Sequence, residues 1–407
     1  MTDTPTTTRR VASLALGRVG SRAVSSAALG ITLLLIARGT TVADFGHLMT
    51  AYTAGLIVGL AVGLGAPTRI LRLDAEHPDL PGTLFVVHSL LVVSAAVIAL
   101  AVATVTGAGW VVVAGIVFAL GDTMQNYAQA HLTARDRQLA ANVLVTSHRL
   151  IPLAVVVVAL VVDGRVGFVL LTTVCVVPIV IGLLAPLSDA SRRSAQMWSA
   201  ARQGASGYWV YALAAMLPQI QIPVLALIAS PVVVGQFSMA TRVIGPVTLL
   251  TASMSAVLVP ELARRISDRG AFDALYAFSV RISAVYLVVV AALAWPGALV
   301  VTLLAGPQYR EATFLVFAMI VSAGIGAFAQ ASNSKLLALG RAGSSARALI
   351  AGGVVGLILL VAVGATAPGG WLWTVPVATQ MLILGTMLHY ARAASPARDL
   401  STSGAPR

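Results

Sequence analysis

The sequence is dominated by long apolar runs that recur along its whole length, separated by short stretches rich in charge, glycine and proline. Each run approaches the roughly 20 residues that an α-helix needs to cross a bilayer. With 58% hydrophobic and only 10% charged residues among 407, the composition excludes a soluble fold. The runs predict an all-α polytopic membrane protein with twelve spans, at about 19–37, 45–66, 82–105, 109–131, 142–162, 166–187, 207–229, 234–259, 282–304, 312–337, 348–366 and 371–390.

The basic residues alternate between the two sides of these spans. The richer connections, those after every second span, carry Arg69 and Arg72, Arg135 and Arg137, Arg192, Arg193 and Arg202, Arg264, Arg265 and Arg269, and Arg341. The other connections carry only Arg38, Arg165 and Arg310. The positive-inside rule then places the richer connections and both basic termini in the cytoplasm. The net charge of +12 is therefore explained by topology and does not indicate a nucleic-acid partner.

The longest break in hydrophobicity, 188–206, falls after the sixth span and predicts a cytoplasmic linker between two six-helix lobes. The predicted organisation is a basic cytoplasmic tail without the apolar core of a signal peptide, an N-lobe, the linker, a C-lobe and a cytoplasmic tail, at 1–18, 19–187, 188–206, 207–390 and 391–407. A gapless shift of 189 residues aligns Ala23 with Ala212, Ile31 with Ile220, Ala37 with Ala226, Gly46 with Gly235 and Ala51 with Ala240. Lobes with an even number of spans would be related by an axis along the membrane normal.

Two patches of about 35 residues carry a family resemblance. Their matching residues are Arg38, Asp44, Phe45, Gly46, Ala51, Tyr52, Gly65, Arg69 and Arg72 in the first, and Gly235, Phe237, Ala240, Arg242, Pro246, Pro260, Glu261, Arg264 and Arg265 in the second. The chain resembles the polysaccharide (O-antigen and teichoic-acid type) flippases of the multidrug/oligosaccharidyl-lipid/polysaccharide exporter superfamily. The resemblance implies two lobes around a central cavity that opens alternately to each face, and polyprenyl-(pyro)phosphate-linked glycans as substrates. The two extra C-terminal helices of some members are not expected here.

Arg242, about eight residues inside the eighth span, is the first candidate for the substrate pathway. A charge at bilayer depth is costly and usually faces a partner or an aqueous cavity. A guanidinium offers a planar fork of donors to phosphate oxygens, so Arg242 is expected to contact pyrophosphate. The alternative is a structural arginine neutralised by helix-end carbonyls or by Asp122.

Asp122 begins a polar stripe in the fourth span, continued by Gln125, Asn126 and Gln129 at helical spacing. Three interpretations stay open for it. Asp122 could exchange H⁺ or Na⁺ to couple transport to an ion gradient, it could pair with Arg242, or the stripe could simply pack helices together. No other cofactor is indicated.

Other polar residues lie near span ends or beside prolines. Arg22 could receive a phosphate from the cytoplasm or snorkel, whereas Arg149, Arg281 and Lys335 are expected to snorkel to the inner surface. In the seventh span Pro218 and Pro223 flank Gln219 and Gln221, which predicts a bend or hinge lining the substrate path, with Pro246 a third hinge candidate and a static kink the alternative. Gln330 and Asn333 belong to a comparable stripe with Ser322 and Gly326 in the tenth span.

Catalytic and metal-site patterns are not visible in the sequence. The six histidines lack ligand spacing, the single cysteine, Cys175, is expected to be buried packing, and neither a phosphate loop nor a nucleophile elbow occurs. The favoured function is a flippase that moves a lipid-linked oligosaccharide from the inner to the outer leaflet. A bacterial plasma membrane is the expected location, because 25 arginines beside one lysine indicate a GC-rich genome. Its expected partners are the bilayer, the glycan substrate, and glycosyltransferases or a polymerase of the same pathway. The alternatives are a cation-coupled multidrug exporter and a membrane polymerase or ligase.

Overall fold

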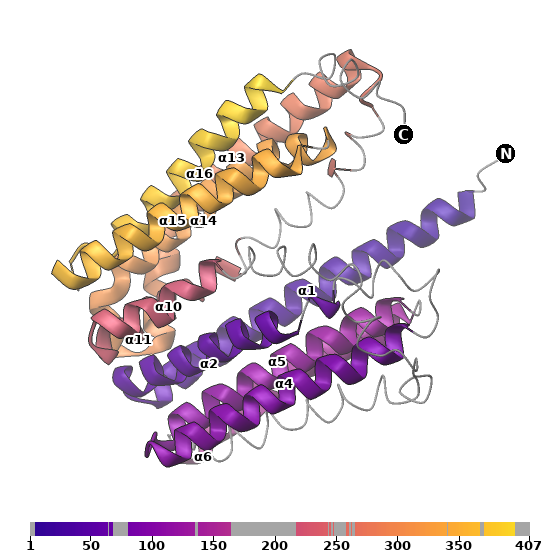
Figure 1. Cartoon of the computed structure of the whole chain (residues 1–407). Helices are drawn as coiled ribbons and strands as arrows, with labels where there is room; N and C mark the ends of the chain where they lie inside the picture. The colour runs from indigo at the N-terminus through magenta and orange to yellow at the C-terminus, as the bar shows by residue number, and fades with distance from the viewer. Residues whose placement is uncertain are drawn as a thin grey trace. The chain divides into compact units, whose positions relative to one another are not determined.

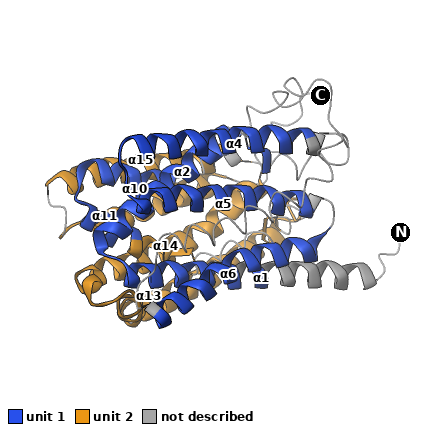
Figure 2. Cartoon of the chain, turned by 90° about the horizontal axis from the view of Figure 1, so that it is seen from below, with its two compact units in different colours: residues 1–238 blue, residues 239–407 orange. Residues whose placement is uncertain are grey.

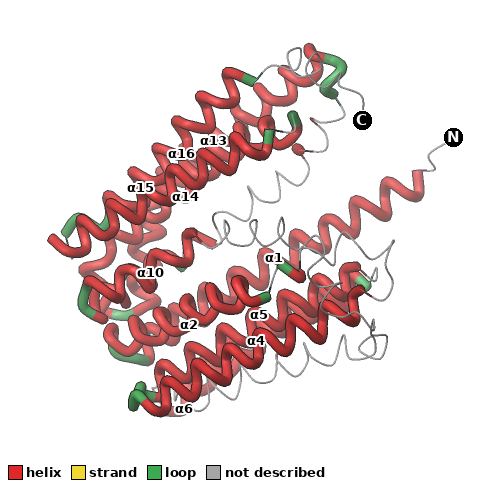
Figure 3. The backbone as a smooth tube through the Cα atoms, in the orientation of Figure 1, coloured by secondary structure: helices red, strands yellow, loops and turns green. Residues whose placement is uncertain are grey.

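Every element that the structure describes is helical, as Figure 3 shows for this computed structural model. The described residues are 5–63, 65–67, 80–134, 137–163, 217–242, 244, 245, 247, 258, 259, 262, 265–339, 341–366 and 370–394. The chain divides into two compact units, unit 1 at Met1–Ser238 and unit 2 at Met239–Arg407 (Figure 2). The predicted linker at 188–206 and the sixth span at 166–187 lie outside the described residues, so the predicted lobe boundaries stay predictions.

The helices of unit 1 are α1 (Pro5–Gly39), α2 (Val42–Val62), α4 (Leu80–Val105), α5 (Trp110–Ala134), α6 (Gln138–Asp163), α10 (Leu217–Ile228) and most of α11 (Pro231–Thr241). The helices of unit 2 are α13 (Arg269–Ala305), the short 3₁₀ helix η1 (Pro307–Ala312), α14 (Thr313–Ala338), α15 (Ala342–Thr366) and α16 (Thr374–Ala393). Where the described residues allow a comparison, each predicted span falls on a helix.

Two helices extend well beyond the predicted spans. Helix α13 begins at Arg269, where Asp268 caps it by accepting a hydrogen bond from the Ala271 amide at 3.0 Å, although the span was predicted to begin at 282. Its 37 residues correspond to about 55 Å, far more than the roughly 30 Å of hydrocarbon. Helix α1 likewise begins at Pro5, inside the predicted tail. Apolar runs locate the bilayer, but helices continue until a cap or breaker ends them.

Membrane crossing is supported by length and apolar character. Among the described residues, seven helices are long and apolar enough to cross a membrane, with η1 and α14 counted as one. Their large exposed side chains include Val97 and Ile98 on α4, Val161 on α6 and Leu303 on α13. In a bilayer such side chains meet lipid, so their exposure is expected. The full count of twelve stays a prediction.

Helices joined by short connections lie side by side, α4 with α5 and α5 with α6 in unit 1, and α13 with α14 and α15 with α16 in unit 2 (Figure 1). In unit 1, α5 packs against α2, α4 and α6, while α1 packs against α6 and α10 against α2. In unit 2, α14 packs against α13, α15 and α16. Helix α5 is therefore the central element of unit 1, and polar residues on it are carried into the interior.

Candidate functional site

The most polar site described inside a bundle is centred on Asp122 of α5. The Asp122 side chain is 5% exposed. It accepts two hydrogen bonds from Arg149 of α6, from Nη1 to Oδ1 at 2.7 Å and from Nη2 to Oδ2 at 3.0 Å. His148 Nε2 lies 2.8 Å from Oδ1, and the Tyr52 hydroxyl of α2 donates to Oδ2 at 2.5 Å. We call these four residues, Tyr52, Asp122, His148 and Arg149, the carboxylate cluster.

The cluster joins three helices through one carboxylate. A bidentate guanidinium and two further donors satisfy most of the acceptor positions of Asp122. The ring of Tyr52 is also held in place, because it stacks on Phe118 at 4.7 Å between centroids. Arg149 offsets the charge of the Asp122 carboxylate, which lowers the cost of keeping either group inside the bundle.

Arg149 was expected to snorkel, and this expectation was wrong. Its side chain is only 13% exposed and is fixed by Asp122. Sequence reasoning named Asp122 as a site residue but offered Arg242 as its ion-pair partner, whereas the partner in the structure is Arg149. The missed signal was the basic pair His148–Arg149 within the next span, since a buried carboxylate needs a cation from a neighbouring helix.

The predicted polar stripe on α5 is divided between two environments. Gln125 is buried, Gln129 is half-buried and Asn126 is exposed. The Gln125 side chain is 3.5 Å from the Gln129 carboxamide oxygen, a long contact. Of the four residues in the stripe, only Asp122 and Gln125 are therefore buried in the interior of unit 1, whereas the Asn126 side chain is exposed at its surface.

A ring stack lies on the face of α5 toward α4. His88, 2% exposed, stacks on Tyr127 with centroids 4.8 Å apart, and Phe85 contacts the same tyrosine at 5.6 Å. Phe85 and Tyr127 belong to a hydrophobic core cluster that includes Met124 and Val92. This stack packs α4 against α5 and offers no constellation for chemistry.

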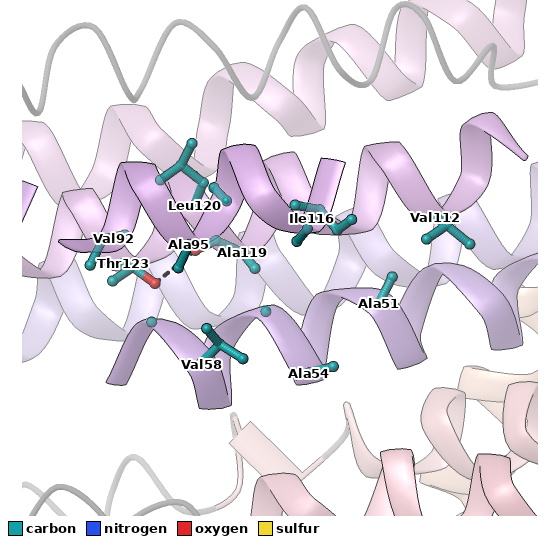
Figure 4. Close-up of a pocket in the computed structure, with 14 residues that line it drawn as sticks. Ala51, Ala54, Val58, Val92, Ala95, Val112, Ile116, Ala119, Leu120 and Thr123 are labelled. Carbon is teal, nitrogen blue, oxygen red and sulfur yellow. Dashed lines mark hydrogen bonds between the residues drawn. The ribbon is translucent and has the colours of Figure 1, made fainter. Parts of the chain in front are cut away.

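An apolar cavity of about 250 Å³ opens between α2, α4 and α5 (Figure 4). Thr123 is the only residue in its lining with a polar side chain, and its hydroxyl already donates to the Ala119 carbonyl at 2.8 Å. The rest of the lining is alanine, glycine, valine, leucine and isoleucine. Such a surface offers no hydrogen-bond partner to a sugar or phosphate, so this cavity does not fit the predicted substrate.

Arg242 lies directly after the last residue of α11. Its amide donates to the Met239 carbonyl at 3.2 Å, its side chain is half-buried, and its Nε and one terminal nitrogen are shielded from solvent. The predicted position inside the eighth span is thus a helix end. Its role, like that of Arg22, whose side chain lies outside the described residues, stays a prediction.

The proline-containing segment is a helix that continues past its proline. Pro223 lies inside α10, half-buried, with Gln219 half-buried one turn earlier. Pro218 is the second residue of the same helix, but its side chain lies outside the described residues, as does the whole of Pro246. The hinge roles stay predictions.

The polar stripe of α14 meets its neighbours in unit 2. Asn333 is buried and accepts a hydrogen bond from Ser345 of α15, which favours the packing interpretation for this residue. Gln330 is half-buried, and its carbonyl accepts from Ser334 at 2.9 Å.

Lys335 was also expected to snorkel, but it is 8% exposed. It donates to the Ala391 carbonyl at 2.8 Å and lies 4.7 Å from the centre of the Tyr276 ring. Because Ala391 is in the last turn of α16, the lysine neutralises the negative end of that helix. Arg281, in contrast, is exposed as expected. Among the described residues no group of three His, Cys, Asp or Glu could hold a metal ion.

Comparison with known proteins identifies the fold. A search of protein-family models and of curated proteins gives no match. Solved structures do match: an inward-facing multidrug-resistance MATE transporter of the MOP superfamily has a TM-score of 0.72 at 13% identity, over 93% of this chain and 96% of that one. The Vibrio cholerae MATE transporter VcmN in its bent form gives 0.59 at 14% identity, over 97% and 99%.

A third structure is described as a MOP superfamily transporter from Pyrococcus furiosus whose binding pocket has reversed polarity, suggesting a different function. It gives a TM-score of 0.57 at 13% identity, over 96% of both chains. The chain therefore has a MATE-like fold. At these identities the likeness concerns the fold alone.

Proposed function

We propose that the protein is a lipid-linked oligosaccharide flippase, which moves a polyprenyl-(pyro)phosphate-linked glycan from the inner to the outer leaflet by alternating access. The observation that carries the proposal is the charge balance at bilayer depth. Asp122 is the one acidic residue in the described parts of the predicted spans, and Arg149 offsets its charge within unit 1. Arg242 adds a further cation to those parts, so their cations outnumber their acids.

An excess of cations favours an anionic cargo. A phosphate-bearing head group gains charge-assisted hydrogen bonds from arginine, whereas an organic cation would be repelled. One structurally similar MOP transporter is described by a reversed polarity of its binding pocket and a different function. We take the polarity of the binding pocket to decide the class of cargo within this fold. In this chain the excess of cations favours an anion.

The decisive experiment uses a strain that lacks the protein. Its lipids are extracted and its surface glycan is measured; the expected result is an accumulated polyprenyl-linked oligosaccharide together with loss of surface polysaccharide. Complementation with Arg242→Ala should fail although the variant reaches the membrane in normal amount, and Arg242→Lys should restore part of the flux because it keeps the charge but not the fork of donors.

The second candidate is a cation-coupled multidrug exporter, which the likeness to MATE transporters favours. It requires Asp122 to release its partners and exchange a proton or Na⁺ for the drug. In that case the deletion strain has unchanged lipids and surface glycan but is sensitive to cationic drugs. That pattern would overturn the flippase proposal.

A further inference from the structure

Two helical hairpins of unit 1 correspond position by position. With the 189-residue shift, the last residue of α1, Gly39, corresponds to the last residue of α10, Ile228. The residues before the following helices, Thr41 and Ser230, also correspond and cap in the same way. The Thr41 hydroxyl accepts from the Asp44 amide at 3.1 Å, and the Ser230 hydroxyl lies 3.5 Å from the corresponding Val233 amide.

Burial follows the same correspondence. The pairs that are buried in both hairpins are Leu33 and Ile222, Ile36 and Leu225, Phe45 and Val234, Gly46 and Gly235, Leu48 and Phe237, and Met49 and Ser238. A shared cap position, shared helix ends and a shared buried face, without a gap in the register, are the features of one structural repeat present twice. From the sequence alone, the alanine and glycine matches could not distinguish such a repeat from a chance similarity between two alanine-rich segments.

The two copies touch each other through equivalent atoms. A Cβ atom added to Gly46 would lie 2.2 Å from the Pro231 carbonyl oxygen. A Cβ added to Gly235 would lie 2.1 Å from the Val42 carbonyl oxygen. Since Val42 and Pro231 are also equivalent under the shift, the contact is reciprocal, as in an isologous interface around a two-fold axis. All four residues belong to unit 1, so this contact lies within one compact unit.

This contact, the glycine seal, consists of Val42, Gly46, Pro231 and Gly235. Its close approach is backbone to backbone: each glycine hydrogen points at a carbonyl oxygen across the interface, a weak Cα–H···O arrangement. Glycine alone permits this approach. None of these four residues has an ionisable side chain, so separating the two sides breaks no ion pair within the seal.

We infer that the glycine seal closes the outer end of the transport path and opens once in every cycle. The inference rests on the proposed alternating access and on the predicted topology, which places the turn of each hairpin at the outer face. A symmetric contact between two repeats suits this task, because both sides separate by the same movement. Leu48, Met49 and Phe237, each within one turn of one of the two glycines, are also buried.

Accessibility of a cysteine beneath the seal tests this inference without knowledge of the cargo. The background is Cys175→Ser, and the reporter is Ser238→Cys, 0% exposed and less than one turn after Gly235. In intact cells a membrane-impermeant maleimide should label this reporter slowly. Adding Gly235→Ala or Gly46→Ala should increase labelling several-fold, because neither Cβ fits. The control is Gly385→Ala in α16, where an added Cβ meets nothing within 4 Å. Unchanged labelling in both seal variants would overturn the inference.

A reversible cross-link provides a test with both glycines intact. His47 and Gln236 follow the two glycines, and His47 is exposed. His47→Cys with Gln236→Cys, joined by a cleavable thiol-specific linker, should abolish transport, and reduction of the linker should restore it. If the cross-linked protein transported at the full rate, the two hairpins would not need to separate, and the inference that the seal opens would be wrong.

The two proposals can fail separately. If the deletion strain accumulates no lipid-linked glycan but the labelling responds as expected, the cargo assignment fails and the seal stands. If the glycan accumulates but labelling does not respond, the flippase stands and the seal is rejected.

Discussion

At the scale of single residues, the carboxylate cluster shows how an acid is kept at bilayer depth. Asp122 accepts from Arg149, from Tyr52 and, through the contact with Nε2, from His148, and these partners come from two other helices. Such a cluster fixes helix positions more than it supplies a free acid. This is the reason why Asp122 supports the exporter hypothesis less than its presence in the sequence suggested.

We predict that Asp122→Asn lowers the free energy of unfolding by about 3 kcal/mol, because it leaves the Arg149 charge buried without its counterion. The measurement is thermal unfolding of the purified protein in detergent. Arg149→Met should destabilise similarly, and the double variant Asp122→Asn/Arg149→Met should lose clearly less than the two single losses combined. Asn126→Ala, an exposed residue on the same helix, is the control. Additive losses would mean that the two side chains do not interact.

At the scale of elements, small residues set how closely the helices pack. Gly55 and Gly59 of α2 face Ala119 and Thr123 of α5, where an added Cβ would lie 2.6 Å from the nearest side-chain atom in both cases. Gly352 and Gly356 of α15 face α16 with the same four-residue spacing. Glycines at this spacing allow close approach of membrane helices. Sequence analysis did not single them out, although the spacing was visible.

Gly352→Leu should destabilise unit 2 by about 1–3 kcal/mol through overpacking. Its Cβ would lie 2.2 Å from Ile383 Cγ1, so Ile383→Ala in the same chain should recover part of the loss by making room. Ala351→Leu is the matched control, because Ala351 is exposed. The readout is the fraction of protein that stays soluble after heating in detergent. If Ile383→Ala did not recover part of the stability, the loss caused by Gly352→Leu would come from a contact other than the one with Ile383.

At the scale of the whole molecule, the alternation of arginine-rich and arginine-poor connections predicts the topology independently of any contact. The MATE-like fold agrees with a multi-pass membrane protein. Which face of the membrane each connection occupies follows from charge alone. The proposed outer position of the glycine seal depends on it.

Single cysteines in the Cys175→Ser background test this topology. Thr106→Cys, exposed between α4 and α5, should react with an impermeant maleimide in intact cells. Gly343→Cys, exposed at the start of α15, should react only after the cells are permeabilised. The reverse pattern would contradict the predicted orientation and would also place the glycine seal on the cytoplasmic side.

The sequence by itself determined the class of the molecule, the approximate positions of the described spans and the predicted orientation, because hydrophobic length and charge act locally along the chain. It also identified Asp122 and Gly46 as notable positions. Only the tertiary structure decided that Arg149 is the partner of Asp122 and that Gly46 and Gly235 meet through equivalent carbonyls. A partner on another helix depends on how the helices are rotated and packed, and that depends on small residues whose spacing recurs in many apolar runs without any packing partner being specified.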